Sequence, residues 1–290
     1  MCAIKLFIIV KIVTEVKELK NLINAFRLNN PKDNIGFIPT MGALHQGHVS
    51  LIDAASDLCN FVITSIFVNP TQFNDKKDLE RYPRTIEADM EVLANTACDV
   101  LFLPTVAEMY PIKDAVYSID LNGLDQVMEG KFRQGHFDGV CNIVESFFRI
   151  IAPDKAFFGI KDFQQVAIIK HMTKVRALKV DVVTCPILRD ASGLAMSSRN
   201  ALLSPQEKES ARILNWVLKL GKLLVQEGKP LSEIKENMLA LFAQGSLDLE
   251  YLEIVDNDTL QAVNSVQPNI SACIVAYCGN VRLIDNIQLN

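Results

Sequence analysis

Apolar and polar positions follow two different patterns along the chain. Short runs rich in β-branched residues alternate with longer segments whose apolar residues recur every three or four positions. This alternation is typical of parallel strands joined by crossover helices, and runs without polar interruption indicate strands buried on both faces. The strands predicted in this way are Leu6–Val10, Ile35–Ile38, Phe61–Val68, Asp99–Leu103, Lys155–Phe158 and Val180–Thr184.

The segments between these runs carry the helical period. One predicted helix covers Thr14 to Phe26, with Thr14 as its candidate N-cap, and another begins near His45. Together the elements predict an α/β fold, a Rossmann-like doubly wound parallel sheet. Ligands of such sheets bind at the carboxyl ends of the strands. The loops expected to carry the chemistry therefore follow Ile38, Val68 and Phe158.

The pattern changes after Pro186. Ser204-Pro205-Gln206-Glu207 has the form of a capping box with proline at the first helical position, and an amphipathic segment follows to about Gln226. We expect a smaller C-terminal α+β domain here, which divides the chain into residues 1–186 and residues 187–290. Its other predicted elements are a helix at Leu231–Phe242 and strands at Tyr251–Val255 and Ala272–Tyr277.

Charge and cysteine content narrow the function classes. The net charge of -5 and the pI of about 5.5 argue against broad electrostatic capture of nucleic acid, which needs clustered lysine and arginine. Seven cysteines without a CxxC pair fit scattered reduced thiols better than a disulfide frame, so we expect a cytoplasmic protein. The apolar run at Leu6–Val10 is too short for a signal sequence or a membrane span.

The most informative stretch is PTMGALHQGH, residues 39–48, which leaves a predicted strand through a glycine turn and enters a helix. The N-terminus of a helix offers unpaired N–H groups and partial positive charge, which suits phosphate. His45 and His48, three residues apart, could add two imidazole donors to such a cradle. A metal-binding pair or two surface histidines remain alternatives for this motif taken alone.

A second candidate element is GLAMSSRN, residues 193–200, a loop of small hydroxyl residues with one guanidinium. Arginine presents a rigid fork suited to phosphate, and serine adds hydrogen bonds without bulk. Taken alone, the segment could be a surface turn. Together, the HxGH and MSSR elements resemble the paired signatures of the nucleotidyltransferase superfamily related to class I tRNA synthetases.

The resemblance narrows when the motifs are read in order. PTMGALHQGH, FVNPTQF, YPRT, GHFDGV, FGIKDFQQ, GLAMSSRN and RLIDN follow one another as they do in pantothenate synthetases. This resemblance implies ATP-dependent condensation of pantoate with β-alanine through a pantoyl-adenylate, with release of AMP and pyrophosphate. It also implies Mg²⁺ as cofactor and a homodimer. By the same resemblance, residues 1–186 would bind ATP and pantoate, and residues 187–290 would carry the MSSR loop and close over the site. The acidic charge balance and the short apolar run predict no nucleic-acid or membrane partner.

The same resemblance implies site residues, position by position. The implied catalytic residues are His45, His48, Lys161 and Arg199. The residues implied to bind pantoate and β-alanine are Asn69, Gln72 and Gln165, and Asp89 is implied to be associated with magnesium. The residues implied at the ATP site are Met41, Gly42, Ala43, Leu44, His45, Gln46, Gly47, His48, Gly159, Ile160, Lys161, Asp162, Leu188, Met196, Ser197, Ser198 and Arg199. The chain departs from the family at Ile160, Gln134, Asp138 and Asn142, and Ile160 leaves only its backbone as a contributor to nucleotide binding.

Several alternatives stay open at this level. The polar segment Asn74–Arg84 is either a lid that excludes water from the adenylate or a plain solvated loop. Arg133 and His136 either lie near the pocket or pack a turn. The alternative functions are a nucleotidyltransferase that stops after nucleotide transfer and a catalytically silent nucleotide- or RNA-binding module of the same fold.

Overall fold

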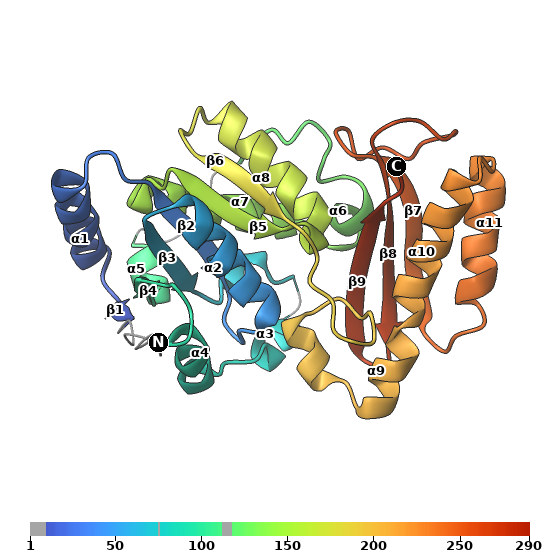
Figure 1. Ribbon diagram of the computed structural model, residues 1–290, viewed down its shortest axis with the longest axis horizontal. Helices are drawn as coiled ribbons and strands as arrows, with labels where there is room; N and C mark the ends of the chain where they lie inside the picture. The colour runs from blue at the N-terminus through green and yellow to red at the C-terminus, as the bar shows by residue number, and fades with distance from the viewer. Residues whose placement is uncertain (1–9, 75, 112–117) are drawn as a thin grey trace, which may run out of the picture. The chain divides into compact units, whose positions relative to one another are not determined.

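A computed structural model describes residues 10–74, 76–111 and 118–290 of the chain (Figure 1). The chain divides into two compact units, each with its own sheet. The first unit comprises Met1–Leu121, Arg133–Gly159 and Ile168–Cys185, and the second comprises Asn122–Phe132, Ile160–Ala167 and Pro186–Asn290.

The first unit is built on a six-stranded sheet in the order β1-β4-β3-β2-β5-β6, and all of its strand pairs are parallel. This confirms the predicted Rossmann-like parallel sheet, whose strands fall within a few residues of the predicted runs. Residues 6–9 of the strand predicted at Leu6–Val10 lie outside the described residues, and the first described strand begins at Lys11. The strands are β1 (Lys11–Val13), β2 (Ile35–Thr40), β3 (Phe61–Ile66), β4 (Val100–Phe102), β5 (Lys155–Gly159) and β6 (Asp181–Cys185).

Helices connect these strands. The prediction that Thr14 caps the first helix is wrong, because Glu15 is the N-cap residue and the Glu108 carboxylate accepts the backbone N–H of Val16 at 2.6 Å. The segment Asn74–Arg84 contains a short helix, α3. The helices are α1 (Val16–Asn29), α2 (Gln46–Leu58), α3 (Lys76–Arg81), α4 (Ile86–Leu93), α5 (Val106–Met109), α7 (His136–Ile151) and α8 (Phe163–Val175), whose first residues belong to the second unit.

Both faces of the parallel sheet are covered. Ile38 packs in a buried cluster with Leu51 and Ile52 of α2, whereas its neighbour Phe37 contacts the ring of Phe147 on α7 at 5.4 Å between centroids. Successive residues of a strand point to opposite faces, so each strand needs apolar residues at every position. This is why the strands appear in the sequence as uninterrupted apolar runs.

The second unit carries a three-stranded antiparallel sheet in the order β7-β8-β9. The predicted capping box is confirmed: Glu207 N donates to Ser204 Oγ at 3.3 Å, and Ser204 N donates to Glu207 Oε2 at 2.8 Å. The predicted helix to Gln226 is interrupted at Arg212, and β9 was not predicted. The elements are α6 (Met128–Phe132), α9 (Pro205–Ala211), α10 (Ile213–Gln226), α11 (Leu231–Phe242), β7 (Asp248–Asp256), β8 (Ile270–Cys278) and β9 (Val281–Gln288).

Across the described parts of the chain, no helix has both the length and the apolar character needed to cross a membrane.

Candidate active site

The loop between β2 and α2 is held in an unusual backbone conformation. Thr40 Oγ1 donates to Ser65 O on β3 at 2.7 Å and accepts the N–H of Gly42 at 3.2 Å. Gly42 and Ala43 then have φ values of 83° and 50°, in the left-handed region that favours glycine. A Cβ on residue 42 would also lie only 3.0 Å from the Asp89 Oδ2 atom. The conformation at position 42 therefore favours glycine, and an added Cβ would crowd the Asp89 carboxylate.

Asp89 of α4 fastens this loop. Its Oδ2 accepts the N–H of Ala43 at 3.0 Å, its Oδ1 accepts the N–H of Leu44 at 2.7 Å, and Thr85 Oγ1 donates to Oδ1 at 3.2 Å. The residue is only 2% exposed. Both carboxylate oxygens are thus engaged with the protein. The association of Asp89 with magnesium, which the resemblance implies without distinguishing a direct contact from one through water, stays a prediction. Within residues 10–74, 76–111 and 118–290, no group of three or more His, Cys, Asp or Glu side chains could hold a metal ion.

The two histidines form a reciprocal cap at the N-terminus of α2. Gly47 N donates to His45 Nδ1 at 3.1 Å, and His45 N donates to His48 Nδ1 at 3.2 Å. The two rings lie 4.1 Å apart between centroids. A ring that accepts at Nδ1 carries its proton at Nε2 in the neutral form, so this geometry assigns Nε2–H as the donor of each ring. Both imidazoles thus cap the helix, and their role in binding a ligand stays a prediction.

Two predicted pocket residues lie together after β3. Asn69 begins the short 3₁₀ helix η1 (Pro70–Gln72), and its Nδ2 donates to Gln72 Oε1 at 3.2 Å and to Gly139 O at 3.0 Å. Gln72 Nε2 reaches the sulfur of Met41 at 3.1 Å. The loops that follow β2 and β3 are therefore joined through predicted site residues.

The surroundings of Asn69 and Gln72 include two further groups. Tyr110 donates its hydroxyl proton to Asn69 Oδ1 at 2.8 Å, and burial raises the pKa of Tyr110 although this bond and one to Thr71 oppose the rise. His136 Nδ1 lies 2.7 Å from the carbonyl oxygen of Gln72, and His136 is buried at the start of α7. His136 therefore contacts the backbone of a predicted pocket residue at the end of the η1 turn, which agrees with both interpretations of this histidine.

In the second unit, Lys161 and Asp162 lie in the 3₁₀ helix η2 (Ile160–Asp162), immediately before α8. Gln165 follows in the first turn of α8 and is partly buried. Its neighbour Gln164 is 3% exposed and donates to the carbonyls of Leu124 and Val127, at 2.6 and 2.9 Å. Gln164 therefore has a structural partner for its amide within the unit.

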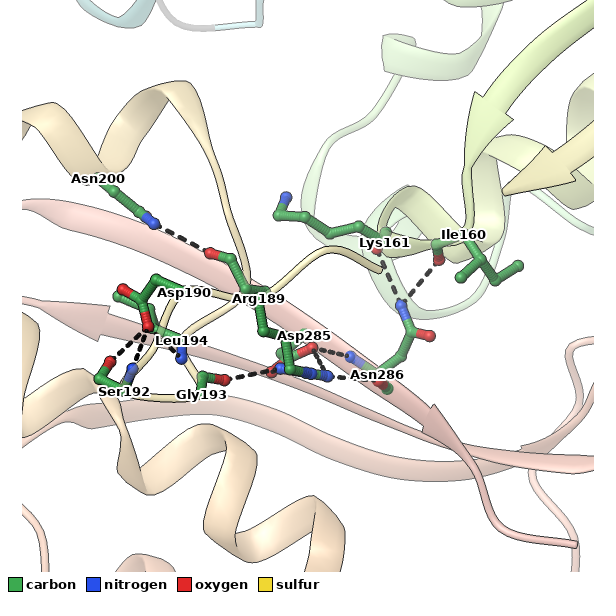
Figure 2. Close-up of polar contacts among 11 residues, drawn as sticks. Ile160, Lys161, Arg189, Asp190, Ser192, Gly193, Leu194, Asn200, Asp285 and Asn286 are labelled. Carbon is green, nitrogen blue, oxygen red and sulfur yellow. Dashed lines mark hydrogen bonds and ion pairs between the residues drawn. The ribbon is translucent and has the colours of Figure 1, made fainter. Parts of the chain in front are cut away.

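The MSSR residues follow a small hairpin in the same unit. Met196 N donates to Leu188 O at 3.0 Å, which brings two predicted ATP-site residues side by side. Ser197 then caps η3 (Ser198–Leu202), because its Oγ accepts the N–H of Arg199 at 3.3 Å. Asn200 Nδ2 donates to Ala195 O at 2.9 Å and ties η3 back to the hairpin (Figure 2).

Asp190 shapes the turn of that hairpin. Its Oδ1 accepts from Ser192 N at 2.8 Å, Ser192 Oγ at 2.6 Å and Leu194 N at 3.1 Å (Figure 2). Desolvation raises the pKa of Asp190, but the hydrogen bonds to its carboxylate lower this pKa by a larger amount. The net shift of the pKa is downward, so the carboxylate form is favoured. The base of the MSSR loop is therefore held by a charged turn at neutral pH.

Comparison with known proteins decides the family. Residues 11–288 match the family described as pantoate-beta-alanine ligase. The chain belongs to this family. It is 46% identical over 280 residues to a pantothenate synthetase of Porphyromonas gingivalis, covering 96% of this chain and 99% of that protein. The crystal structure of the pantothenate synthetase from Thermus thermophilus matches with a TM-score of 0.91 at 34% identity, covering 96% of this chain and 99% of that one.

A third relative in the family was crystallised with ligands. The pantoate-beta-alanine ligase from Francisella tularensis, complexed with beta-gamma ATP and beta-alanine, matches with a TM-score of 0.80 at 33% identity, covering 97% of this chain and 98% of that one.

Within this ligase family member, each unit gathers part of the predicted site. The first unit joins Met41, Asn69 and Gln72 and fixes both histidines. The second unit holds the Lys161 turn and the MSSR hairpin. The sequence does not point to Tyr110, which has no motif around it. The sequence shows the RLIDN motif, residues 282–286, but assigns no role to it. The residues of that motif with contacts in the site region are Asp285 and Asn286.

Proposed function

We propose that the chain catalyses the ATP-dependent condensation of pantoate with β-alanine, through a pantoyl-adenylate. Family membership over residues 11–288 supports this activity. ATP and β-alanine as substrates are also supported by the Francisella tularensis relative, which was crystallised with ligands of these two kinds. The structural observation that carries the proposal is the pair of histidines at the N-terminus of α2.

ATP binding is proposed to centre on this helix terminus. The N-terminus of α2 supplies partial positive charge, and the Nε2–H groups of His45 and His48 supply hydrogen-bond donors for phosphate oxygens. Lys161 and Arg199 add cationic charge, and Ser197 and Ser198 add hydroxyl donors. Other members of the proposed ATP site are Met41, Gly42, Ala43, Leu44, Gln46, Gly47, Gly159, Ile160, Asp162, Leu188 and Met196.

In the first half-reaction a carboxylate oxygen of pantoate attacks the α-phosphorus, and pyrophosphate leaves. No protein nucleophile takes part, so catalysis consists of positioning the reactants and stabilising the charge on the α-phosphoryl oxygens. We assign this stabilisation to His48 and Lys161. In the second half-reaction the β-alanine amine attacks the acyl carbon, the C–N bond forms, and AMP leaves.

Pantoate is proposed to bind to Asn69, Gln72 and Gln165. Amides can bond the hydroxyls and the carboxylate of pantoate without pairing the attacking oxygen with a full cation, which would lower its nucleophilicity. The contacts of Asn69 with Gln72 and Tyr110 orient the amides of η1 before substrate arrives. Preorientation of this kind reduces the entropy lost on binding.

Magnesium is proposed to enter with ATP rather than on a protein ligand, because the Asp89 carboxylate already accepts two backbone N–H groups. No step above depends on a protein-held metal ion. The homodimer, the cytoplasmic location and the division at residues 186 and 187 stay predictions.

The direct test is an assay with pantoate, β-alanine, ATP and Mg²⁺ that quantifies AMP and pantothenate. Equal amounts of the two products are expected, and AMP without pantothenate would contradict the proposal. His48→Ala and Lys161→Ala should each lower kcat/KM by at least ~100-fold, since each loses transition-state stabilisation of about 2.7 kcal/mol or more. Near-normal turnover in either variant would mean that the replaced residue has no catalytic role.

A further inference from the structure

The RLIDN motif lies on β9, and two of its side chains form a buried polar network within the second unit (Figure 2). Asp285 and Asn286 are 3% and 4% exposed. Polar side chains buried to this extent are retained where they have specific partners. The partners here are the residues that precede α8 and those that precede the MSSR loop.

Asn286 clamps the backbone of the Lys161 turn. Its Nδ2 donates to Ile160 O and to Lys161 O, each at 2.9 Å. A primary amide nitrogen carries two N–H donors, so it can serve two successive carbonyls from one atom. Figure 2 shows the Lys161 side chain extending away from Asn286 while its carbonyl faces the amide. The clamp therefore fixes where the lysine side chain starts and leaves its ammonium group to the substrate.

The same strand holds the hairpin before the MSSR loop. Arg189 donates to both oxygens of Asp285, at 2.6 and 2.9 Å, and to Gly193 O at 3.2 Å. Asn286 N in turn donates to Asp285 Oδ1 at 2.8 Å. A bidentate guanidinium–carboxylate pair is geometrically restrictive. One strand thus fixes the backbone of both segments that carry the proposed cationic residues of this unit.

We propose that Asn286 is a positioning residue for adenylation, acting through the backbone of residues 160 and 161 on the Lys161 ammonium group. This rests on the proposed role of Lys161. A flexible lysine side chain can reach the phosphoryl oxygens from several backbone positions. Its ammonium group stabilises the transition state well only when the backbone from which the side chain extends is fixed. Displacement of about 1 Å in such a group costs up to about 100-fold in rate.

The test measures pyrophosphate release in a single turnover with ATP and pantoate, without β-alanine. We expect Asn286→Ala to lower this rate about 10- to 100-fold, with KM values for ATP and pantoate changed less than about 3-fold. Asn286→Ser, which keeps one donor, should release pyrophosphate at a rate between those of the unmodified enzyme and Asn286→Ala. It replaces the alanine variant in the test if that variant does not fold. Asn237→Ala, which removes an exposed amide on α11, is the matched control and should match the unmodified enzyme.

The deciding measurement combines Asn286→Ala with Lys161→Ala. If Asn286 acts through Lys161, the double variant is no slower than Lys161→Ala alone, whereas a general structural role gives multiplicative losses. Multiplicative losses, or an unchanged rate in Asn286→Ala, overturn the inference and leave the proposed function intact. A normal rate in Lys161→Ala instead removes the proposed role of Lys161, and the inference falls with it.

Discussion

At the scale of single residues, the Asp89 carboxylate holds the loop that we propose to bind the phosphates of ATP. Ala43 and Leu44 present successive N–H groups to its two oxygens, and Gly42 and Ala43 both have positive φ. For Ala43, which is not a glycine, such a conformation costs of order 1–3 kcal/mol and persists only when its surroundings fix it. The buried carboxylate supplies that constraint.

Asp89→Asn is therefore expected to weaken ATP binding. Asparagine can accept one of the two backbone N–H groups but turns its amide NH₂ toward the other. The hydrogen bond lost in this way is worth about 1–3 kcal/mol, so the Kd for ATP should rise roughly ten-fold. Calorimetric titration with ATP, with and without Mg²⁺, measures the effect. Asp53→Asn, on the exposed side of α2, is the control. A loss seen only in the presence of Mg²⁺ would instead support Asp89 as a metal ligand.

Gln72 and Gln165 should matter for pantoate and not for ATP. If these amides bind pantoate as proposed, replacing either by alanine leaves polar groups of the substrate without partners, a loss of about 1 to 3 kcal/mol. The KM for pantoate should then rise roughly ten-fold or more. Calorimetry of Gln72→Ala and Gln165→Ala with each substrate separates the effects, and Gln206→Ala on exposed α9 is the control. Normal pantoate binding with weakened ATP binding would reverse the pocket assignment.

At the scale of elements, the close packing of α7 against η1 sets the position of Gln72. A Cβ on Gly139 would lie 2.5 Å from Thr71 O and 2.7 Å from the Gln72 Cα atom. No side chain fits there without moving the backbone of η1. His136, from the same helix, adds a bond to the Gln72 carbonyl. The GHFDGV motif thus contributes a helix end that supports the pocket residues.

Gly139→Ala should displace η1 and weaken pantoate binding. Overpacking against backbone costs about 1–3 kcal/mol of stability, and the displaced Gln72 amide should raise the KM for pantoate about ten-fold. Thermal unfolding and steady-state kinetics report the two effects. Ser146→Ala on the same helix removes only a hydroxyl bond to Asn142 O and is the control. An unchanged KM together with a lowered Tm would limit Gly139 to a structural role.

The elements differ in how well the sequence predicts them. The parallel strands were predictable because burial on both faces requires continuous apolar runs, as at Ile35–Ile38. Strand β9 was missed because Arg282, Asp285 and Asn286 interrupt its apolar pattern to serve ion pairs and backbone carbonyls. The cap of α1 was assigned wrongly because its acceptor, Glu108, is distant in sequence. Long-range polar partners leave no local signal, so the roles of Asp89 and Tyr110 also required the structure.

At the scale of the whole molecule, the proposed chemistry divides into two half-reactions that share an activated intermediate. An acyl-adenylate hydrolyses unless water is excluded, so it should form and persist on the enzyme before β-alanine reacts. ATP carrying ¹⁸O in the α–β bridge tests this order. Reversible adenylation frees the bound pyrophosphate to rotate, and resynthesis of ATP then moves label from the bridge to a non-bridging position of the β-phosphate.

We expect this positional exchange with ATP, Mg²⁺ and pantoate in the absence of β-alanine, and no exchange when pantoate is omitted. Nuclear magnetic resonance resolves the labelled positions because ¹⁸O shifts the β-phosphorus signal. In Lys161→Ala the exchange should slow at least ~100-fold, in line with the loss expected in kcat/KM, because the same charge stabilises adenylation in both directions. Exchange that requires β-alanine would mean that the amine takes part before pyrophosphate is released, and the adenylate route would have to be replaced by a concerted one.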